Sequence, residues 1–183
     1  MISLKNIDKT WSLFLDRDGV INEEKDMDYI NTWEEFRFYE GALEAIKIFA
    51  QKFGRIVIVT NQRGIAKGVT KLDELDRIHE NLLKEIALAE GRIDKIYYCG
   101  DLENSSLNRK PNPGMGLKAI QDFPEINVSK SIMIGNTLSD MQFGRNLGVA
   151  LNVFVTTTRP DIIIPNTLID HAFSSLIAVA KAL

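Results

Sequence analysis

The chain has 183 residues, a formal net charge of −3 and a hydrophobic fraction of 45%, which are ordinary values for one globular domain, so a single domain over residues 1–183 is expected. This charge provides no broad positive field, which argues against a nucleic-acid partner. With one cysteine and no apolar run of membrane-spanning length, the sequence predicts a cytoplasmic protein without a membrane partner, most simply a monomer.

Short apolar runs alternate along the chain with amphipathic stretches. Runs rich in β-branched and aromatic residues predict strands at 12–15, 56–60, 96–99, 131–134 and 151–155. Helices are expected at 41–53, 71–90, 113–122, 138–147 and, as a last short one, 174–183. This alternation is typical of an α/β fold in which helices cover both faces of a parallel sheet, the three-layer Rossmann-like arrangement.

The first predicted strand ends in two carboxylates. Asp16 and Asp18 follow it directly, and Gly19 then allows a sharp turn. In an open parallel sheet, ligands bind beyond the carboxyl ends of the strands, so the pair can share one site and attract a divalent cation. The alternative is a solvated Asp-Gly turn, because these residues are common in turns.

The second predicted strand ends in a polar loop that contains glycine. Thr60, Asn61, Gln62 and Arg63 precede Gly64, and their hydroxyl, amide and backbone N–H groups suit phosphoryl oxygens. An ordinary strand-to-helix loop is the alternative interpretation of this segment alone.

The third predicted strand is followed by a long irregular stretch at 100–112. Near its end are two cations, Arg109 and Lys110, which are followed by Pro111 and Pro113. The prolines restrict the backbone, which suggests that they fix the positions of the two cations. A surface charge pair, for example between Arg109 and Glu103, is the alternative.

The fourth predicted strand ends in a glycine turn. Asn136 follows at the expected crevice, and Asp140 comes about one helical turn later. The alternative is that Asn136 or Ser139 caps the next helix, since such residues are common at helix N-termini.

In this order the four motifs resemble those of the haloacid dehalogenase superfamily of aspartate-based phosphohydrolases. The amino-acid sequence of the motifs is most similar to one branch of the superfamily, subfamily IIIA, which lacks a large cap domain. This branch contains heptose 1,7-bisphosphate 7-phosphatases and histidinol-phosphate phosphatases. The similar segments are Phe-Leu-Asp-Arg-Asp-Gly-Val-Ile-Asn, Thr-Asn-Gln-Arg-Gly-Ile-Ala-Lys-Gly, Tyr-Tyr-Cys and Arg-Lys-Pro-Asn-Pro-Gly.

The resemblance implies a magnesium-dependent phosphomonoester hydrolase that works through an aspartyl-phosphate. Asp16 would be the nucleophile and Asp18 the general acid and base, while Thr60 and Lys110 would stabilise the phosphoryl group. Magnesium would be held by Asp16, Asp18 and Asn136. Asp140 would orient the magnesium ligands or Lys110, or would itself be a further ligand.

The resemblance also implies a small phosphorylated metabolite as substrate, and a heptose bisphosphate is the favoured one. Asn61, Gln62, Arg63, Arg109 and Lys110 are expected to bind it, with help from the segment 22–38. Histidinol phosphate is the alternative substrate. The 3′-phosphatases of DNA-end repair share similar motifs, but the net negative charge of this chain argues against a DNA substrate. A non-catalytic protein that binds phosphate ligands is the remaining alternative.

Two positions depart from the branch. Many members bind a structural zinc through further cysteines and a histidine, but Cys99 is the single cysteine here and neither His79 nor His171 lies in the loop, so no zinc is expected. Asn136 stands where an aspartate ligand of magnesium is usual. An amide oxygen can coordinate a hard cation but brings no charge, so weaker metal binding is expected.

Overall fold

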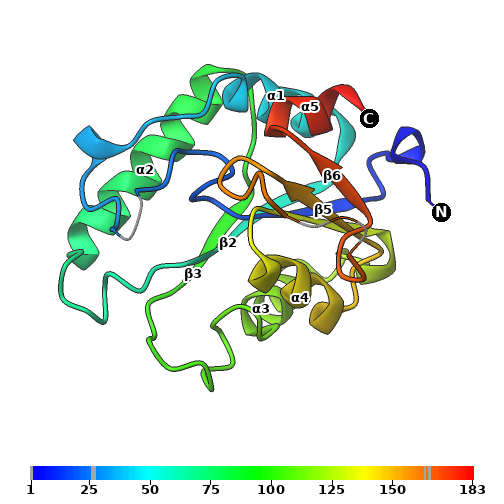
Figure 1. Cartoon of the computed structure of the whole chain (residues 1–183). Helices are drawn as coiled ribbons and strands as arrows, with labels where there is room; N and C mark the ends of the chain where they lie inside the picture. Colours follow the sequence, from blue (N-terminus) through cyan, green and yellow to red (C-terminus); the bar gives the residue numbers. More distant parts are fainter. Residues whose placement is uncertain (1, 26–27, 163, 165) are drawn as a thin grey trace.

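A six-stranded, fully parallel sheet forms the centre of the computed structural model, which describes residues 2–25, 28–162, 164 and 166–183. The strand order is β3-β2-β1-β4-β5-β6 (Figure 1). The strands are β1 (Ser12–Leu15), β2 (Arg55–Asn61), β3 (Lys95–Cys99), β4 (Ser131–Gly135), β5 (Leu151–Val155) and β6 (His171–Phe173). The predicted α/β class is confirmed.

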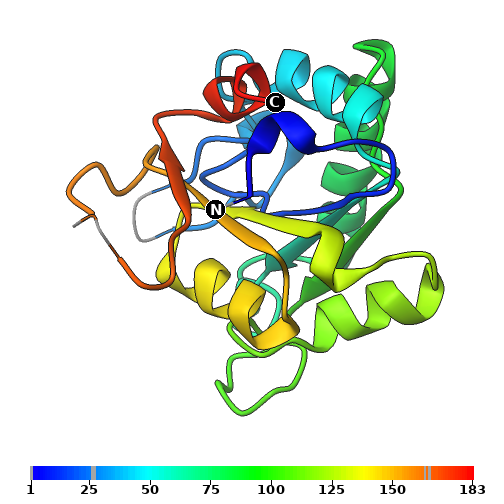
Figure 2. The ribbon, with the colours of Figure 1, turned by 90° about the vertical axis from the view of Figure 1, so that its right-hand side faces the viewer.

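Helices cover both faces of the sheet. They are α1 (Ala42–Lys52), α2 (Leu72–Leu88), α3 (Gly114–Asp122), α4 (Leu138–Leu147) and α5 (Leu176–Lys181). The first, second and fifth helices pack on one face and the third and fourth on the other, as Figures 1 and 2 show. The predicted three-layer arrangement is therefore confirmed.

Two hydrophobic cores, one on each face, hold these layers together. Leu13 and Leu15 of β1 belong to the core under α1 and α2, whereas Phe14 between them belongs to the core under α3 and α4. Successive side chains of a strand point to opposite faces, so one short apolar strand contributes to both cores. Each fully buried side chain of this size stabilises the fold by about 1.5–3 kcal/mol.

Most predicted elements lie within about two residues of the observed ones, but one strand is additional. Strand β6 pairs in parallel with β5 and has only three residues, of which none is fully buried. Such a short, half-exposed segment has no apolar run from which a strand could be predicted in the sequence. At α3, Pro113 is the N-cap residue and the helix begins at Gly114, one position later than predicted.

The strand order places a crevice beside the ends of β1 and β4. The chain runs from β1 to β2 and β3 on one side, then returns to β4 on the other, so the direction of winding reverses between β1 and β4. Within the described part of the segment between β1 and α1, the helical structure is limited to the three-residue 3-10 turn Trp33–Glu35. None of the helices in the described ranges is both long and apolar enough to cross a membrane.

Candidate active site

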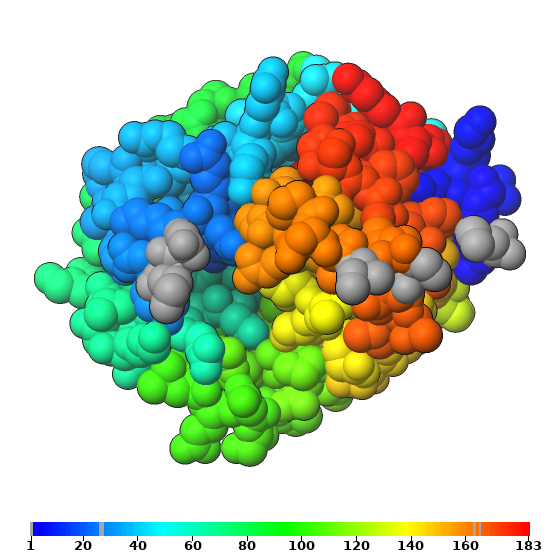
Figure 3. Space-filling model, viewed as in Figure 1, coloured from blue at the N-terminus to red at the C-terminus, as the bar shows by residue number. Residues whose placement is uncertain are grey.

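A cavity of about 270 Å³ opens at the carboxyl ends of β1, β2 and β4. In Figure 3 the surface is hollowed where the blue, teal, yellow and orange parts of the chain meet. The cavity is lined by Asp16, Asp18, Glu24, Thr60, Asn61, Arg109, Lys110, Asn136, Thr137, Ser139 and Asp140. Residues from four separate motifs therefore meet around one cavity.

Lys110 connects two buried carboxylates at the floor of this cavity. Its Nζ lies 2.8 Å from Asp16 Oδ1 and 2.6 Å from Asp140 Oδ1, and it donates a hydrogen bond to the Val59 carbonyl oxygen at 2.8 Å. Only 2% of the Lys110 side chain is exposed. Three acceptors thus satisfy the three N–H groups of a buried ammonium, which keeps it charged and fixed in direction.

Burial and neighbouring charges both shift the pKa values of Lys110 and Asp16. Burial lowers the pKa of Lys110, but the two carboxylates, Asp140 before Asp16, outweigh this effect and raise it above its usual value. Burial and the charge of Asp140 raise the pKa of Asp16 to about 7, although Lys110 acts against them. The cluster therefore has an excess of negative charge that a cation in the cavity would offset.

Asp18 is held on a different set of donors. Arg17 Nη2 donates to both oxygens of its carboxylate at 2.9 Å, Asn22 Nδ2 donates to Oδ1 at 2.9 Å, and Gln62 Nε2 donates to Oδ2 at 2.8 Å. Burial alone would raise the pKa of Asp18, but the Arg17 guanidinium and the hydrogen bond from Asn22 hold it below its usual range. Asp16 and Asp18 share the cavity, as the sequence predicted, but have separate supports.

Asn136 presents an amide oxygen that has no protein partner. Its Nδ2 donates to Thr158 Oγ1 at 2.7 Å, while Oδ1 is buried and, in the part of the chain that the structure describes, accepts no hydrogen bond. Gly19 passes close to this amide with φ +77°, and a Cβ there would lie 2.0 Å from Nδ2. Only glycine combines this backbone conformation with this close approach.

The oxygen groups around the cavity fit a hard divalent cation. Asp16 receives both of its contacts on Oδ1, from Lys110 and from the Arg17 backbone N–H, and no hydrogen bond from a described residue reaches Oδ2. Asn136 Oδ1 is the second free oxygen. Carboxylate, amide and carbonyl oxygens with room for water are the ligands that Mg²⁺ prefers.

Both carboxylate oxygens of Asp140 bind other groups of the protein, so neither is free in the cavity. Its Oδ2 accepts from the Thr137 backbone N–H at 3.0 Å and from Thr137 Oγ1 at 2.7 Å, which forms a capping box at the start of α4. The cap of this helix is thus Thr137, and not Asn136 or Ser139 as the alternative interpretation of the sequence proposed. With Oδ1 bound to Lys110, both oxygens of Asp140 are engaged.

The predicted substrate-binding residues have different positions. Asn61 lines the cavity and binds the backbone of Lys110 through both ends of its amide, at 3.0 and 3.1 Å. Gln62 is not among the residues that line the cavity, and its Nε2 donates to Asp18 Oδ2 at 2.8 Å and to Thr60 Oγ1 at 2.9 Å. Arg63 is exposed and lies outside the cavity lining.

Arg109 lines the cavity and is 7% exposed. It donates to Asn104 Oδ1 and to the Asp101 carbonyl oxygen, both at 3.3 Å, and it forms no ion pair with Glu103 or any other described carboxylate. Burial and the nearby Arg63 guanidinium lower the pKa of Arg109. The surface-pair alternative is therefore not what the structure shows, and the cation faces the cavity without a counter-charge from the described chain.

Several site residues were not identified from sequence. Glu24 lies in the segment 22–38 that was expected to contact substrate, of which residues 26 and 27 lie outside the described ranges. His79 belongs to the buried face of α2, where its Nε2 lies 3.0 Å from Arg17 Nη1. Burial and this guanidinium lower the pKa of His79 to about 3, so its ring is neutral and accepts the bond.

Cys99 is a buried thiol at the end of β3. Its Sγ lies 3.5 Å from Asp101 Oδ2 and 3.9 Å from Ser106 Oγ. Among the described residues, no three histidine, cysteine, aspartate or glutamate side chains are grouped to hold a metal ion by themselves.

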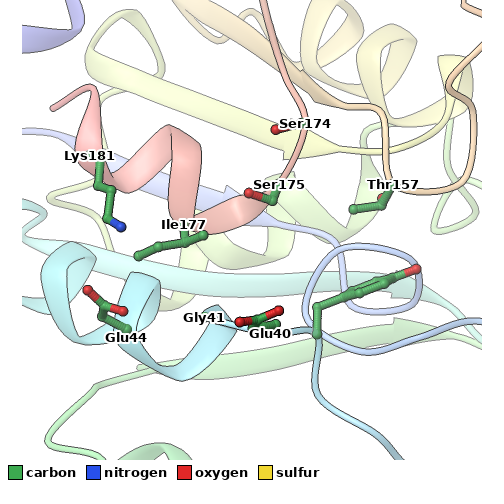
Figure 4. A pocket seen from close by; sticks show the side chains of 9 residues that line it. Glu40, Gly41, Glu44, Thr157, Ser174, Ser175, Ile177 and Lys181 are labelled. Carbon is green, nitrogen blue, oxygen red and sulfur yellow. The ribbon is translucent and has the colours of Figure 1, made fainter.

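A larger hollow of about 520 Å³ lies elsewhere, between α1 and α5. Figure 4 shows Glu40 and Glu44 on one side of it and Ile177 and Lys181 on the other. None of the predicted site residues lines this hollow. The smaller cavity, where charged groups converge, is therefore the candidate active site.

Comparisons with known proteins agree with this geometry. A family model described as Polynucleotide kinase 3 phosphatase matches residues 12–158. The chain is 40% identical over 153 residues to the D-glycero-alpha-D-manno-heptose-1,7-bisphosphate 7-phosphatase of Campylobacter jejuni, covering 84% of this chain and 87% of the relative. It is 31% identical over 179 residues to the D-glycero-beta-D-manno-heptose-1,7-bisphosphate 7-phosphatase of Haemophilus influenzae, covering 94% and 96%.

Among solved structures, the chain resembles D,D-heptose 1,7-bisphosphate phosphatase from B. bronchiseptica, which was crystallised with magnesium and phosphate. The TM-score is 0.81 at 26% sequence identity, and the match covers 93% of this chain and 96% of the other. The chain thus belongs to the Polynucleotide kinase 3 phosphatase family, within the haloacid dehalogenase superfamily, and is a phosphatase.

Proposed function

We propose that this enzyme removes the 7-phosphate from D-glycero-D-manno-heptose 1,7-bisphosphate with the help of Mg²⁺. The observation that carries the proposal is the contact of Lys110 with both Asp16 and Asp140 at the meeting point of the strand ends. The names of the relatives in Campylobacter and Haemophilus support the substrate. We further expect the enzyme to act in the cytoplasm as a monomer.

Asp16 is the proposed nucleophile. Its carboxylate attacks phosphorus, the new P–O bond forms an aspartyl-phosphate, and the ester P–O bond breaks with its electron pair on the sugar oxygen. Asp18 gives that oxygen a proton and later takes one from the water that hydrolyses the intermediate. The charge of the bound phosphate favours the protonated form of Asp18 for the first of these steps.

The remaining motif residues position the phosphoryl group. Thr60 and Asn61 line the cavity and would offer an O–H and an N–H to its oxygens, while Lys110, whose three N–H groups are engaged, would contribute its positive charge. Such preorganised groups stabilise the charge that develops in phosphoryl transfer. Asp16, the Asp18 backbone carbonyl and Asn136 would hold Mg²⁺. When bound, the cation would neutralise negative charge on the transferred group.

The second phosphate of the substrate is assigned to Arg109, with Arg63 nearby. Arg109 faces the cavity without a described counter-charge, and a guanidinium can bind phosphate through two parallel hydrogen bonds. This observation favours a bisphosphate over histidinol phosphate, which has only one phosphate. The net charge of −3 disfavours DNA ends, which proteins grip through many cations.

A substrate panel tests the proposal. Phosphate release is measured with Mg²⁺ from both anomers of heptose 1,7-bisphosphate, heptose 7-phosphate, histidinol phosphate and a 3′-phosphorylated oligonucleotide. We expect the highest kcat/KM for a heptose bisphosphate and no turnover by Asp16→Asn. Arg109→Gln should raise KM for the bisphosphate more than for heptose 7-phosphate. A higher kcat/KM for histidinol phosphate or the oligonucleotide would refute the assigned substrate, and phosphate binding without turnover would refute the catalytic role.

A further inference from the structure

Asp18 rests on a buried support made by Arg17 and His79. The Arg17 side chain is 1% exposed, and its Nη2 and Nε donate to the Asp18 carboxylate at 2.9 to 3.3 Å. On its other side, Arg17 Nη1 donates to His79 Nε2 at 3.0 Å. One guanidinium thus joins the catalytic loop after β1 to helix α2.

This support is costly to build, which argues that it has a function. A guanidinium taken out of water loses several kcal/mol of hydration, which only good partners for its N–H groups offset. His79 occupies a position on the same buried side of α2 as the aliphatic Leu75, Ile78 and Leu82. A leucine at position 79 would bring no polar group to this side of the helix, but it would leave Arg17 Nη1 without its acceptor.

The contacts also restrict the direction of the Asp18 carboxylate. Arg17 binds both of its oxygens, while Asn22 and Gln62 each add one neutral N–H donor. A planar guanidinium that binds two oxygens fixes the plane of a carboxylate, which single donors cannot do. Because Arg17 is itself bound to His79, that plane is defined relative to α2 as well as to the loop.

We propose that Arg17 is a positioning residue for Asp18, and that His79 holds Arg17 in place so that the carboxylate stays aligned with the leaving-group oxygen. This inference rests on the proposed function, in which Asp18 transfers the proton. It predicts a specific kinetic defect. Loosening the support should slow the departure of a leaving group that needs a proton, and should spare one that leaves as a stable anion.

The test compares two substrates in single-turnover measurements. One is p-nitrophenyl phosphate, whose phenolate leaves without a proton, and the other is a sugar phosphate that the parent enzyme hydrolyses. The variants are Arg17→Lys, His79→Leu and His79→Gln, whose amide oxygen can still accept from Arg17. Arg92→Lys is the matched control, because Arg92 binds the carbonyl oxygens of Phe53 and Gly54 and the Asp94 carboxylate, at the opposite end of the sheet.

We expect Arg17→Lys to lower the sugar-phosphate rate by about tenfold more than the nitrophenol rate. His79→Leu should show a smaller effect of the same kind, His79→Gln should recover part of it, and Arg92→Lys should show none. Equal losses on both substrates, or a faster sugar-phosphate reaction, would overturn the inference. Melting temperatures are measured in parallel, and an unstable Arg17→Lys leaves the two His79 variants to decide.

Asp18→Asn separates this inference from the proposed function. If Asp18→Asn shows the leaving-group selectivity and the Arg17 and His79 variants do not, the positioning role is wrong and the acid/base role stands. If Asp18→Asn itself lowers both rates equally, the acid/base assignment fails, and the positioning role fails with it.

Discussion

Thr158 fixes the orientation of Asn136 by accepting a hydrogen bond from its amide nitrogen, with Nδ2 and Oγ1 2.7 Å apart. The amide oxygen is thereby left buried beside the cavity, and no described residue binds it. An amide held in this way offers an oxygen, and not a nitrogen, to a cation. At the proposed magnesium site, the asparagine would supply a neutral ligand at a position where the superfamily usually has an aspartate.

Replacing Thr158 with valine should weaken Mg²⁺ binding. Without the acceptor, the amide can rotate and present its nitrogen, and loss of such a supporting contact costs about tenfold in metal affinity. Isothermal titration of the phosphate-free protein with Mg²⁺ measures the change. Thr156→Val is the control, because the Thr156 hydroxyl lies by the Phe173 carbonyl instead of Asn136. Equal affinity in Thr158→Val and the parent would contradict the role of Thr158.

Replacing Asn136 with aspartate should tighten Mg²⁺ binding. The new carboxylate adds a negative charge at the buried oxygen, and affinity for a hard cation rises with the charge of its ligands. The half-saturating Mg²⁺ concentration for phosphate release should fall, and titration calorimetry should give the same direction. An Asn136→Asp enzyme that needs as much magnesium as the parent would show that Asn136 is not a ligand.

Replacing Gly19 with alanine should damage the metal site as well as stability. A Cβ would lie 2.0 Å from Asn136 Nδ2, and φ of +77° costs a non-glycine residue about 1–2 kcal/mol. Gly68 offers a matched control, because its φ is +70° and nothing lies within 4 Å of its Cβ position. Urea unfolding should show a greater loss for Gly19→Ala than for Gly68→Ala, and only Gly19→Ala should bind Mg²⁺ more weakly. Equal losses of stability and of Mg²⁺ affinity in Gly19→Ala and Gly68→Ala would show that the close approach of residue 19 to Asn136 has no effect.

Replacing Lys110 with methionine should lower both stability and activity. The change leaves the buried carboxylates of Asp16 and Asp140 without their shared counter-charge, which typically costs about 3–5 kcal/mol. Urea unfolding of the metal-free protein at pH 8 measures the loss. Lys95→Met removes an exposed ion pair with Asp122 and should have a much smaller effect. Comparable losses in the two variants would mean that the buried cluster is not held by Lys110.

The residues that could be placed from sequence are those whose position follows from the order of the strands. Asp16 and Asn136 directly follow β1 and β4, and Thr60 lies near the end of β2. Parallel strands bring these carboxyl ends to one edge of the sheet. Their meeting around one cavity therefore follows from local pattern and topology alone. Lys110 was found through its motif, although it follows a long loop and not a strand.

The residues that could not be placed act through contacts between distant parts of the chain. His79 reaches Arg17 across 62 positions, and Thr158 reaches Asn136 across 22. Periodicity shows that His79 lies on the buried face of a helix but not what that face touches there. The cap at Thr137 was missed for a different reason, since several neighbouring residues of the motif can cap a helix and only geometry selects one.

Replacing Asp16 with asparagine should remove activity and yet stabilise the metal-free protein at high pH. The pKa of Asp16 is raised from 3.8 to about 7 in the folded state, first by burial and then by Asp140. A raised carboxyl pKa means that the folded state resists ionisation. The charge of Asp16 therefore lowers the free energy of unfolding increasingly as pH rises from about 4 to about 7, and fully above that.

The neutral asparagine avoids this loss, while Lys110 keeps Asp140 and the Val59 carbonyl as partners. The advantage of Asp16→Asn in melting temperature should thus be larger at pH 8 than at pH 5. Saturating Mg²⁺ should reverse the order, because the cation stabilises only a protein that can bind it. Asp8→Asn is the control, since the Thr10 side chain and backbone lower the pKa of Asp8 and its replacement should give no such advantage. An advantage of Asp16→Asn that shrinks between pH 5 and pH 8 would refute the raised pKa, because the ionised carboxylate would then stabilise the fold.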